Sequence, residues 1–271
     1  MSRLRDKLVR MLGSAPVEPA REVQTSVPGE DTVDVQELLR RRVARLQAAR
    51  VKVDLPEGSE VTNARGTCWV RRLVYEPMHL HGNRRLVETK AGPGALFLDV
   101  ETTGLAGGAG TVVFLTGIAQ FQDDRLVLEQ VFLRSFAEEG AALQHVADRL
   151  ARSEQLVTFV GKTFDRHRLA ARFGVQRIEH QILTMPHQDL YYVARRALRG
   201  SVPNTRLRTV ERVLLGLERA DDLPGSEAPA AFLSWLRDRT GLVDRVFEHN
   251  RLDVLSLVTL LGCFTPEQLR S

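Results

Sequence analysis

Four acidic residues of this 271-residue chain stand beside apolar residues that a folded core would bury. They are Asp99, Glu101, Asp165 and Asp253. A buried carboxylate is costly unless it is paired or binds a cation. Carboxylate oxygens are the ligands that hard divalent ions such as Mg²⁺ prefer. Brought together by the fold, these four residues would form a site for metal-assisted cleavage of phosphodiester bonds.

Asp99 and Glu101 stand one residue apart at the end of the apolar segment 95–101. Side chains alternate along a strand, so both carboxylates are expected on one face. Strand ends are also where open α/β sheets place their ligands. An isolated pair of this kind is equally typical of a solvated strand end. The apolar strand before it and the turn Thr102-Thr103-Gly104 after it favour a site.

The other acidic residues are expected on helices. Asp165 opens an expected helix, where a carboxylate also interacts favourably with the helix dipole. His249 and Asp253 are four residues apart and therefore share one helix face with apolar Val246 and Val254. The pair is consistent with an intrahelical contact, or with a metal ligand beside a group that orients or deprotonates water.

The apolar pattern predicts the elements that position these groups. Strands are expected over 68–75, 95–101, 111–121, 126–133 and 155–160, and helices over 138–152, 164–173, 189–198, 207–215, 228–238 and 242–263. Three consecutive strands, then a helix, a strand and further helices, predict an α/β fold with a mixed sheet flanked by helices.

Composition divides the chain into three parts. Residues 1–31, interrupted by prolines, are expected to be a disordered lead-in. Residues 32–93 are expected to form an N-terminal extension, with an amphipathic helix over 32–50 followed by short strands. Residues 94–264 are expected to form the main domain, which carries all four acidic residues.

Charge and targeting signals restrict the partners and the compartment. The net charge of +4 and the pI of 9.4 favour a polyanionic partner, although weakly. No apolar run is long enough to span a bilayer, and no apolar signal core follows the charged N-terminus. We therefore expect a cytoplasmic protein without membrane association. Cys68 and Cys263 are expected to be free thiols, and no Cys/His spacing indicates zinc.

In order and spacing, these motifs resemble those of the DEDD (DnaQ-like) 3′–5′ exonuclease superfamily, which has the ribonuclease-H-like fold. Residues 97–105 are similar to its first motif, Phe164-Asp165 to a later one, and His249-x-x-x-Asp253 to the last. Within that superfamily the chain most resembles the bacterial YprB-type ribonuclease-H-like proteins. The segments that carry this resemblance are 207–216, 221–225 and 249–257.

The resemblance implies a nuclease that hydrolyses phosphodiester bonds with two divalent ions, Mg²⁺ or Mn²⁺. It further implies a 3′–5′ exonuclease acting on single-stranded DNA or RNA. Asp99 would bridge both ions and Glu101 would bind the ion on the nucleophile side. Asp165 and Asp253 would complete the two sets of ligands, and His249 would act as general base.

Further residues near the motifs are expected to contact the substrate or to support the ligands. The expected substrate contacts are Thr102, Thr103, Gly104, Leu105, Lys162 and Phe164, and the expected supporting residues are Asp189 and Asn250. Asp189 is expected either to cap a helix or to orient toward the site. Arg166 is expected to contact a phosphate or to be a solvated charge. Tyr191 and Tyr192 are the candidates for stacking on a base.

Two positions depart from the superfamily pattern. His249 and Asp253 have the spacing of the branch that carries tyrosine in the histidine's place. Val160 stands where many relatives have asparagine. These departures leave room for a non-catalytic nucleic-acid-binding module on the same fold. A structure-specific endonuclease, which keeps the chemistry but cuts internally, is a separate alternative.

Overall fold

The computed structural model describes residues 51–89, 92, 94–104, 110–219 and 222–270. The expected lead-in, the expected helix over 32–50 and the expected substrate contact Leu105 all lie outside these ranges.

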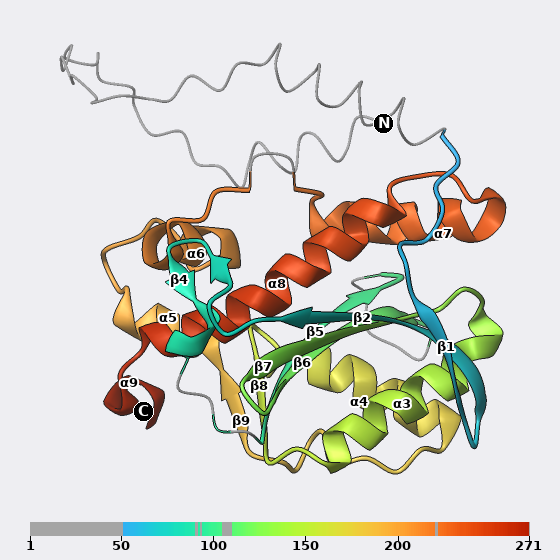
Figure 1. Ribbon diagram of the computed structural model, residues 1–271, viewed down its shortest axis with the longest axis horizontal. Coiled ribbons are helices and arrows are strands. Elements are labelled where there is room, and N and C mark those ends of the chain that lie inside the picture. Colours follow the sequence, from blue (N-terminus) through green and yellow to red (C-terminus); the bar gives the residue numbers. More distant parts are fainter. Residues whose placement is uncertain (1–50, 90–91, 93, 105–109, 220–221, 271) are drawn as a thin grey trace, which may run out of the picture. The chain divides into compact units, whose positions relative to one another are not determined.

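One seven-stranded sheet organises the described residues (Figure 1). Its strands are β1 Ser59–Asn63, β2 Gly66–Tyr75, β5 Ala95–Thr102, β6 Val113–Gln122, β7 Arg125–Phe132, β8 Gln155–Thr158 and β9 His187–Asp189, in the order β1-β2-β7-β6-β5-β8-β9. β8 runs parallel to β5 and β9, whereas the other neighbours pair antiparallel. The prediction of a mixed sheet is confirmed. Residues 59–75, from the expected N-terminal extension, form the β1–β2 hairpin and add two strands to this sheet.

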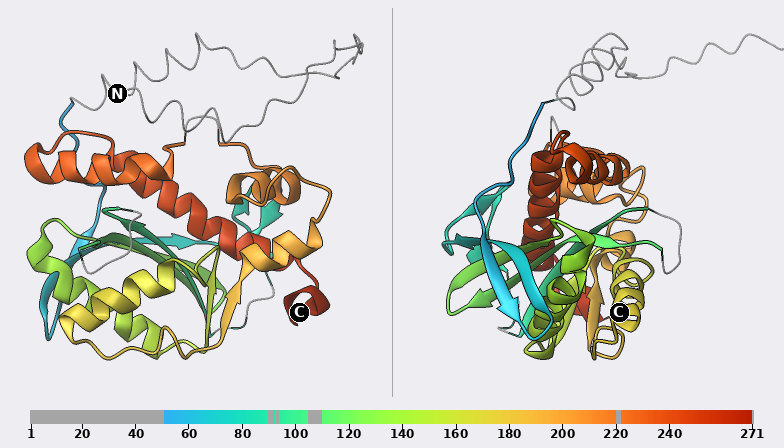
Figure 2. Two further views of the ribbon diagram at one scale, coloured as in Figure 1. Left: turned by 180° about the vertical axis from the view of Figure 1, so that it is seen from behind. Right: turned by 90° about the vertical axis from the view of Figure 1, so that its right-hand side faces the viewer.

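Helices cover both faces of the sheet (Figures 1 and 2). One face carries α3 Glu139–Ala151 and α4 Asp165–Gln176, and the other carries α8 Val243–Cys263. Packed against α8 are α5 Leu190–Ala197, α6 Leu207–Leu215 and α7 Ala228–Asp238, together with the small hairpin β3 Leu80–His81 and β4 Arg84–Arg85 and the 3₁₀ turn η1 Leu86–Glu88. The short helix α9 Pro266–Arg270 ends the described chain.

The alternation of side chains along β5 determines which face receives the acidic residues. Leu96 and Leu98 pack in the hydrophobic cluster that includes α3 and α4. Ala95 and Phe97 pack in the cluster that includes α5 and α8. Since Asp99 continues the second series, its carboxylate lies on the α8 side of the sheet.

Among the described strands and α-helices, β9 and α9 were not predicted from the sequence. β9 has only three residues, too few for alternation to be recognised, and it forms by pairing with β8. Cys68 and Cys263 are free thiols, as expected. Within the described ranges, none of the helices combines the length and the apolar character needed to cross a membrane.

Candidate active site

β5 presents Asp99 and Glu101 toward α8 at the end of the strand. Glu101 is buried and Asp99 is half-buried. The pairing with β6 becomes irregular between Glu101 and Thr102, next to the second carboxylate. Such irregularities re-aim side chains at sheet edges and beside sites. The two carboxylates therefore occupy the place that the strand pattern indicated.

A glycine in β6 lets α8 approach Asp99 closely. Gly117 pairs with Asp99, and a Cβ at this glycine would lie 2.4 Å from Asn250 Oδ1. Asn250 uses the space to donate from Nδ2 to Asp99 Oδ2 at 2.8 Å, and it accepts a hydrogen bond from Gln130 Nε2 at 2.9 Å. Gln130 also donates to the Phe247 carbonyl. Asn250, expected from the sequence to be a supporting residue, thus holds Asp99 directly, whereas its own partner Gln130 was not singled out.

Asp165 is the first residue of α4 and is buried. Burial, and after it the charge of Asp99, raise the pKa of Asp165 well above its usual range. Burial and Asp99 likewise raise the pKa of Glu101 well above its usual range. For Asp99 itself, burial and Asp253 raise the pKa to about 7. The four acidic residues therefore face one another closely enough for their charges to repel.

This donor set fits a hard divalent cation in its chemistry. Every expected ligand is a carboxylate, and mutual repulsion in a buried setting is what a bound cation relieves. In the arrangement observed, no three His, Cys, Asp or Glu side chains of the described residues are disposed to hold a metal ion. Closing the carboxylates around an ion therefore requires movement of their side chains.

His249 lies between three carboxylates. Its Nδ1 is 2.8 Å from Asp222 Oδ1, and its Nε2 is 3.8 Å from Glu101 Oε1 and 3.6 Å from Asp253 Oδ2. Burial opposes its protonation, but the Asp222 hydrogen bond and the other two charges outweigh burial and raise the pKa of His249 to about 10. His249 is therefore an imidazolium in this arrangement, a cation inside the acidic cluster and not a base ready to accept a proton.

Arg219, between α6 and α7, is a second cation in the cluster. Its Nη1 donates to Asp253 Oδ1 and, at 3.2 Å, to Asp222 Oδ2, and its Nη2 donates to Glu211 on α6. The side chain is only 3% exposed. Sequence reasoning did not single out Arg219, because the residue lies in a loop and has no periodic or motif context of its own.

Comparison with known proteins supports the same family as the motifs. The model of the RNase H superfamily matches residues 96–264. The chain belongs to the RNase H superfamily. It is also 36% identical over 168 residues to the uncharacterized protein YprB of Bacillus subtilis (strain 168). That match covers 60% of this chain and 40% of YprB, so the chain spans less than half of that relative. The expected fold family is confirmed.

Solved structures resemble the chain at low sequence identity. The family B DNA polymerase of the archaeon Pyrobaculum calidifontis is 13% identical, with a TM-score of 0.49 over 71% of this chain and 28% of that one. E. coli exonuclease I in complex with an oligonucleotide is also 13% identical, with a TM-score of 0.42 over 65% of this chain and 42% of that one.

Asp189, expected either to cap a helix or to orient toward the site, caps α5 in this protein. Its carboxylate accepts hydrogen bonds from the backbone N–H groups of Tyr191, Val160 and Lys162. It therefore caps α5 and also holds the turn that leads from β8 to α4. Val160 in that turn has a φ of 64°, a left-handed conformation that a β-branched residue rarely adopts and asparagine tolerates.

The expected substrate contacts are distributed around the carboxylates with different exposure. Thr102 is buried and donates to the Gly104 carbonyl, and Thr103 Oγ1 accepts from the Val112 N–H, so both hydroxyls shape the turn after β5. Lys162 is exposed, with its ammonium group 5.5 Å from the centre of the Tyr192 ring. Phe164 is half-buried beneath the Arg168 guanidinium.

Arg166, expected to contact a phosphate or to be a solvated charge, is partly buried and forms hydrogen bonds within the protein. It donates to the carbonyls of Ile182 and Leu183 and lies 2.9 Å from His187 Nδ1. These contacts tie the start of α4 to the loop before β9.

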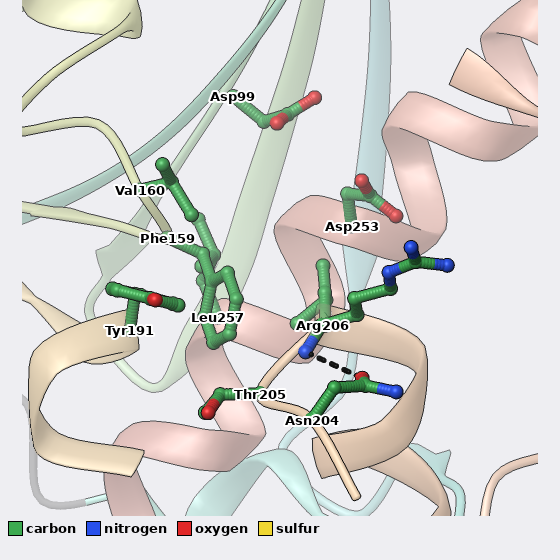
Figure 3. Close-up of a pocket in the computed structure, with 10 residues that line it drawn as sticks. Asp99, Phe159, Val160, Tyr191, Asn204, Thr205, Arg206, Asp253 and Leu257 are labelled. Atoms are coloured by element: carbon green, nitrogen blue, oxygen red, sulfur yellow. Dashed lines mark hydrogen bonds between the residues drawn. The ribbon is translucent and has the colours of Figure 1, made fainter. Parts of the chain in front are cut away.

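A pocket of about 460 Å³ opens beside the carboxylates (Figure 3). Asp99 and Asp253 line one end. The rest of the lining comes from Phe159, Val160, Tyr191, Asn204, Thr205, Arg206, Leu207 and Leu257. In Figure 3, Phe159 and Tyr191 lie on one side, and Asn204 and Arg206 on the other. The pocket lies within the size range of ligand sites and combines apolar walls with a few polar groups.

Proposed function

We propose that this protein is a divalent-metal-dependent nuclease that hydrolyses phosphodiester bonds, and that it acts as a 3′–5′ exonuclease on single-stranded DNA or RNA. One observation carries the proposal: Asp99, Glu101 and Asp165 are held together in a buried cluster that opens on a pocket, with pKa values raised by burial and by one another. A fold retains such repulsion at a cost, which a bound cation offsets. Membership of the RNase H superfamily supports the same chemistry.

Two Mg²⁺ or Mn²⁺ ions held by the four carboxylates would stabilise the charge on the attacking and leaving oxygens. Asn250 donates to the Asp99 carboxylate and would orient it for this role. Glu101 and Asp253 flank His249, whereas Asp165 approaches from α4. By the family resemblance, Asp99 would contribute to both ions, and the other three carboxylates would complete the coordination.

His249 is proposed to transfer the proton of the attacking water. Its proton is retained because Asp222, Asp253 and Glu101 surround it. If Glu101 and Asp253 held divalent ions, two of the charges that raise the His249 pKa would be offset. Asp222 then fixes Nδ1 and leaves Nε2 directed toward the carboxylates as the proton acceptor.

The pocket beside the carboxylates is proposed to receive an unpaired part of the strand. Phe159 and Tyr191 offer apolar ring surface to a base. Arg206 is exposed at the opposite side, and among the described residues no carboxylate pairs with its guanidinium. It is therefore available to a phosphate. A double-stranded substrate would have to expose a base to use these surfaces.

A non-catalytic binding module is the second candidate. It is favoured by the absence, among the described residues, of three side chains already disposed around a metal position, and by the protonated state of His249. This candidate predicts salt-dependent binding of nucleic acid without turnover.

The test is incubation of the full chain with 5′-labelled single-stranded DNA or RNA in Mn²⁺, Mg²⁺ or EDTA. The variants are Asp99→Ala and, as a matched control, Asp148→Ala on the exposed surface of α3. We expect a ladder of shortened products with wild type and the control only, lost in EDTA. Cleavage by Asp99→Ala at the wild-type rate would overturn the proposal. A salt-sensitive gel shift without cleavage would favour the binding module, and nicking of a circular strand would favour an endonuclease.

A further inference from the structure

A buried arginine connects the candidate metal ligands to the interior of the protein. Arg219 donates to three carboxylates on three different segments, namely Asp253, Asp222 and Glu211. Asp253 is an expected ligand, and Asp222 is the hydrogen-bond partner of His249. One guanidinium therefore contacts both an expected ligand and the residue that orients the candidate base.

The Arg219 contact restricts how Asp253 can present its carboxylate. Oδ1 of Asp253 accepts from Arg219 Nη1, whereas Oδ2 faces His249 Nε2 at 3.6 Å. The oxygen that faces the acidic cluster is consequently the one that Arg219 leaves free. Asp222 is held in the same way, because its Oδ2 accepts a hydrogen bond from Arg219 and its Oδ1 contacts His249 Nδ1.

Arg219 is itself held by a buried polar chain. Glu211, which is fully buried, accepts from Arg219 and from the Ser256 hydroxyl. Ser256 lies on α8 three residues after Asp253 and is 2.7 Å from His81 Nε2 in the β3–β4 hairpin. Burial, and after it the charge of Arg219, lower the His81 pKa to about 3, so the imidazole is neutral and adds no competing charge.

A buried ion pair elsewhere in the molecule shows what a purely structural arrangement looks like. Arg172 donates from Nε and Nη2 to both oxygens of Glu139, a bidentate pair on the other face of the sheet. Arg219 divides its donors among three acids, and within the described residues its Nε has no partner. Arg219 therefore forms no bidentate pair, which would be the stronger contact, and instead orients several carboxylates at once.

We propose that Arg219 is a positioning residue, which orients Asp253 for the divalent ion and, through Asp222, orients His249. The inference rests on the proposed function. A lysine would keep the positive charge but not the planar fork that reaches three acids, so the proposal predicts that charge alone is insufficient.

The test is the affinity of the full chain for Mn²⁺, measured by the electron paramagnetic resonance signal of free Mn²⁺, alongside kcat and KM on single-stranded DNA. We expect Arg219→Met to weaken Mn²⁺ binding tenfold or more and to lower kcat, with little change in KM for the strand. Arg219→Lys is expected to recover only part of the loss. Arg172→Met is the matched control, since it breaks a buried pair without contacting the site, and it should leave Mn²⁺ affinity unchanged.

The possible outcomes separate this inference from the proposed function. Wild-type Mn²⁺ affinity in folded Arg219→Met would overturn the positioning role, even if the protein proves to be a nuclease. If Arg219→Met does not fold, Arg219→Lys decides, and an unchanged affinity in that variant would overturn the role. Weakened Mn²⁺ binding in a protein that never cleaves would support the positioning of Asp253 and reject the nuclease. Absence of Mn²⁺ binding in wild type would overturn both.

Discussion

The two faces of the sheet each bury carboxylates, but with opposite electrostatic outcomes. On the α3 side, Glu129 accepts hydrogen bonds from Arg149 and lies 2.9 Å from His145 Nε2. Burial opposes ionisation there, but His145 and then Arg149 outweigh it and hold the Glu129 pKa below its usual range. On the α8 side, Asp99 and Glu101 have raised pKa values. Burial alone therefore does not identify a site, whereas a buried cluster in which carboxylates outnumber the neighbouring cations does.

The backbone shows a similar difference between the two regions. Arg177, which is left-handed, closes α4 at its C-terminus, a position where this conformation is common. Val160, also left-handed, is β-branched and lines the pocket beside Asp99. Strain of this kind persists only where the surroundings enforce it, and it concentrates at functional sites. Here the Asp189 carboxylate, bonded to the Val160 N–H, provides the enforcement.

The largest effect expected from this comparison is on cleavage. Glu101→Gln removes one proposed ligand from the acidic cluster. We expect cleavage of single-stranded DNA to fall by about 100-fold or more, since even residues that only support metal ligands contribute up to about that factor. Single-turnover rates in Mn²⁺ would show the loss. Glu101→Gln with wild-type rates would mean that the raised pKa of Glu101 has no connection with catalysis.

A large effect on stability is expected on the opposite face. Glu139→Gln leaves Arg172 buried without its charged partner, and breaking a buried pair in this way costs about 3–5 kcal/mol. Urea unfolding would report the change in the free energy of unfolding. We expect the rate of cleavage per folded molecule to stay at the wild-type value. If Glu139→Gln were instead stable and inactive, the assignment of a structural role to this face and a catalytic role to the α8 face would be wrong.

A smaller effect is expected in the pH dependence of the free energy of unfolding, measured in EDTA so that no divalent ion is bound. The folded-state pKa of Asp99 is about 7, above its unfolded value, because burial and Asp253 disfavour the charged form. The native state therefore binds more protons than the unfolded state between about pH 4 and pH 7, and this group makes stability fall as pH rises through that window. Asp99→Asn should be more stable than wild type at pH 8, with the difference shrinking toward pH 5. A constant difference in urea unfolding across this range would contradict the raised pKa.

The smallest predicted effect concerns the strained turn. Val160→Asn replaces a β-branched residue at φ 64° by one that tolerates the left-handed region. Since the penalty for an ordinary residue there is about 1–2 kcal/mol, we expect a gain of about 1 kcal/mol in stability. Val213→Asn, at an exposed position of α6, is the control and should give no gain. Equal responses of the two variants would show that the turn is not strained.

Much of the candidate site was predictable because its acidic residues lie at recognisable places in local patterns. The Asp99 and Glu101 pair follows from strand alternation, and His249 with Asp253 follows from helix spacing. The predicted ranges of α6 and α7 coincide with the observed helices, and those of β5 and α8 differ by one residue at one end. The common cause is that each pattern depends on neighbours close in sequence, where alternation and helical periodicity are directly visible.

Asn250 was expected as a supporting residue, but the more distant residues that hold the candidate ligands were not predictable in this way. Gln130 reaches Asn250 across 120 residues, and Arg219 reaches Asp253 across 34. No local period encodes such contacts, and a loop arginine is by default a solvated charge. The protonation of His249 could not be predicted from the sequence either, because it depends on three carboxylates that come from β5, α8 and the segment before α7.

By itself, the sequence determined the set of acidic residues, their order and the secondary structure that carries them, since these depend on residue type and on short-range periodicity. Only the tertiary structure decided which carboxylates are left without a balancing cation, which are held by Arg219, and where the pocket opens. The physical reason is that the energy of a buried charge depends on the partners that packing brings to it. Those partners come from segments that are distant along the chain.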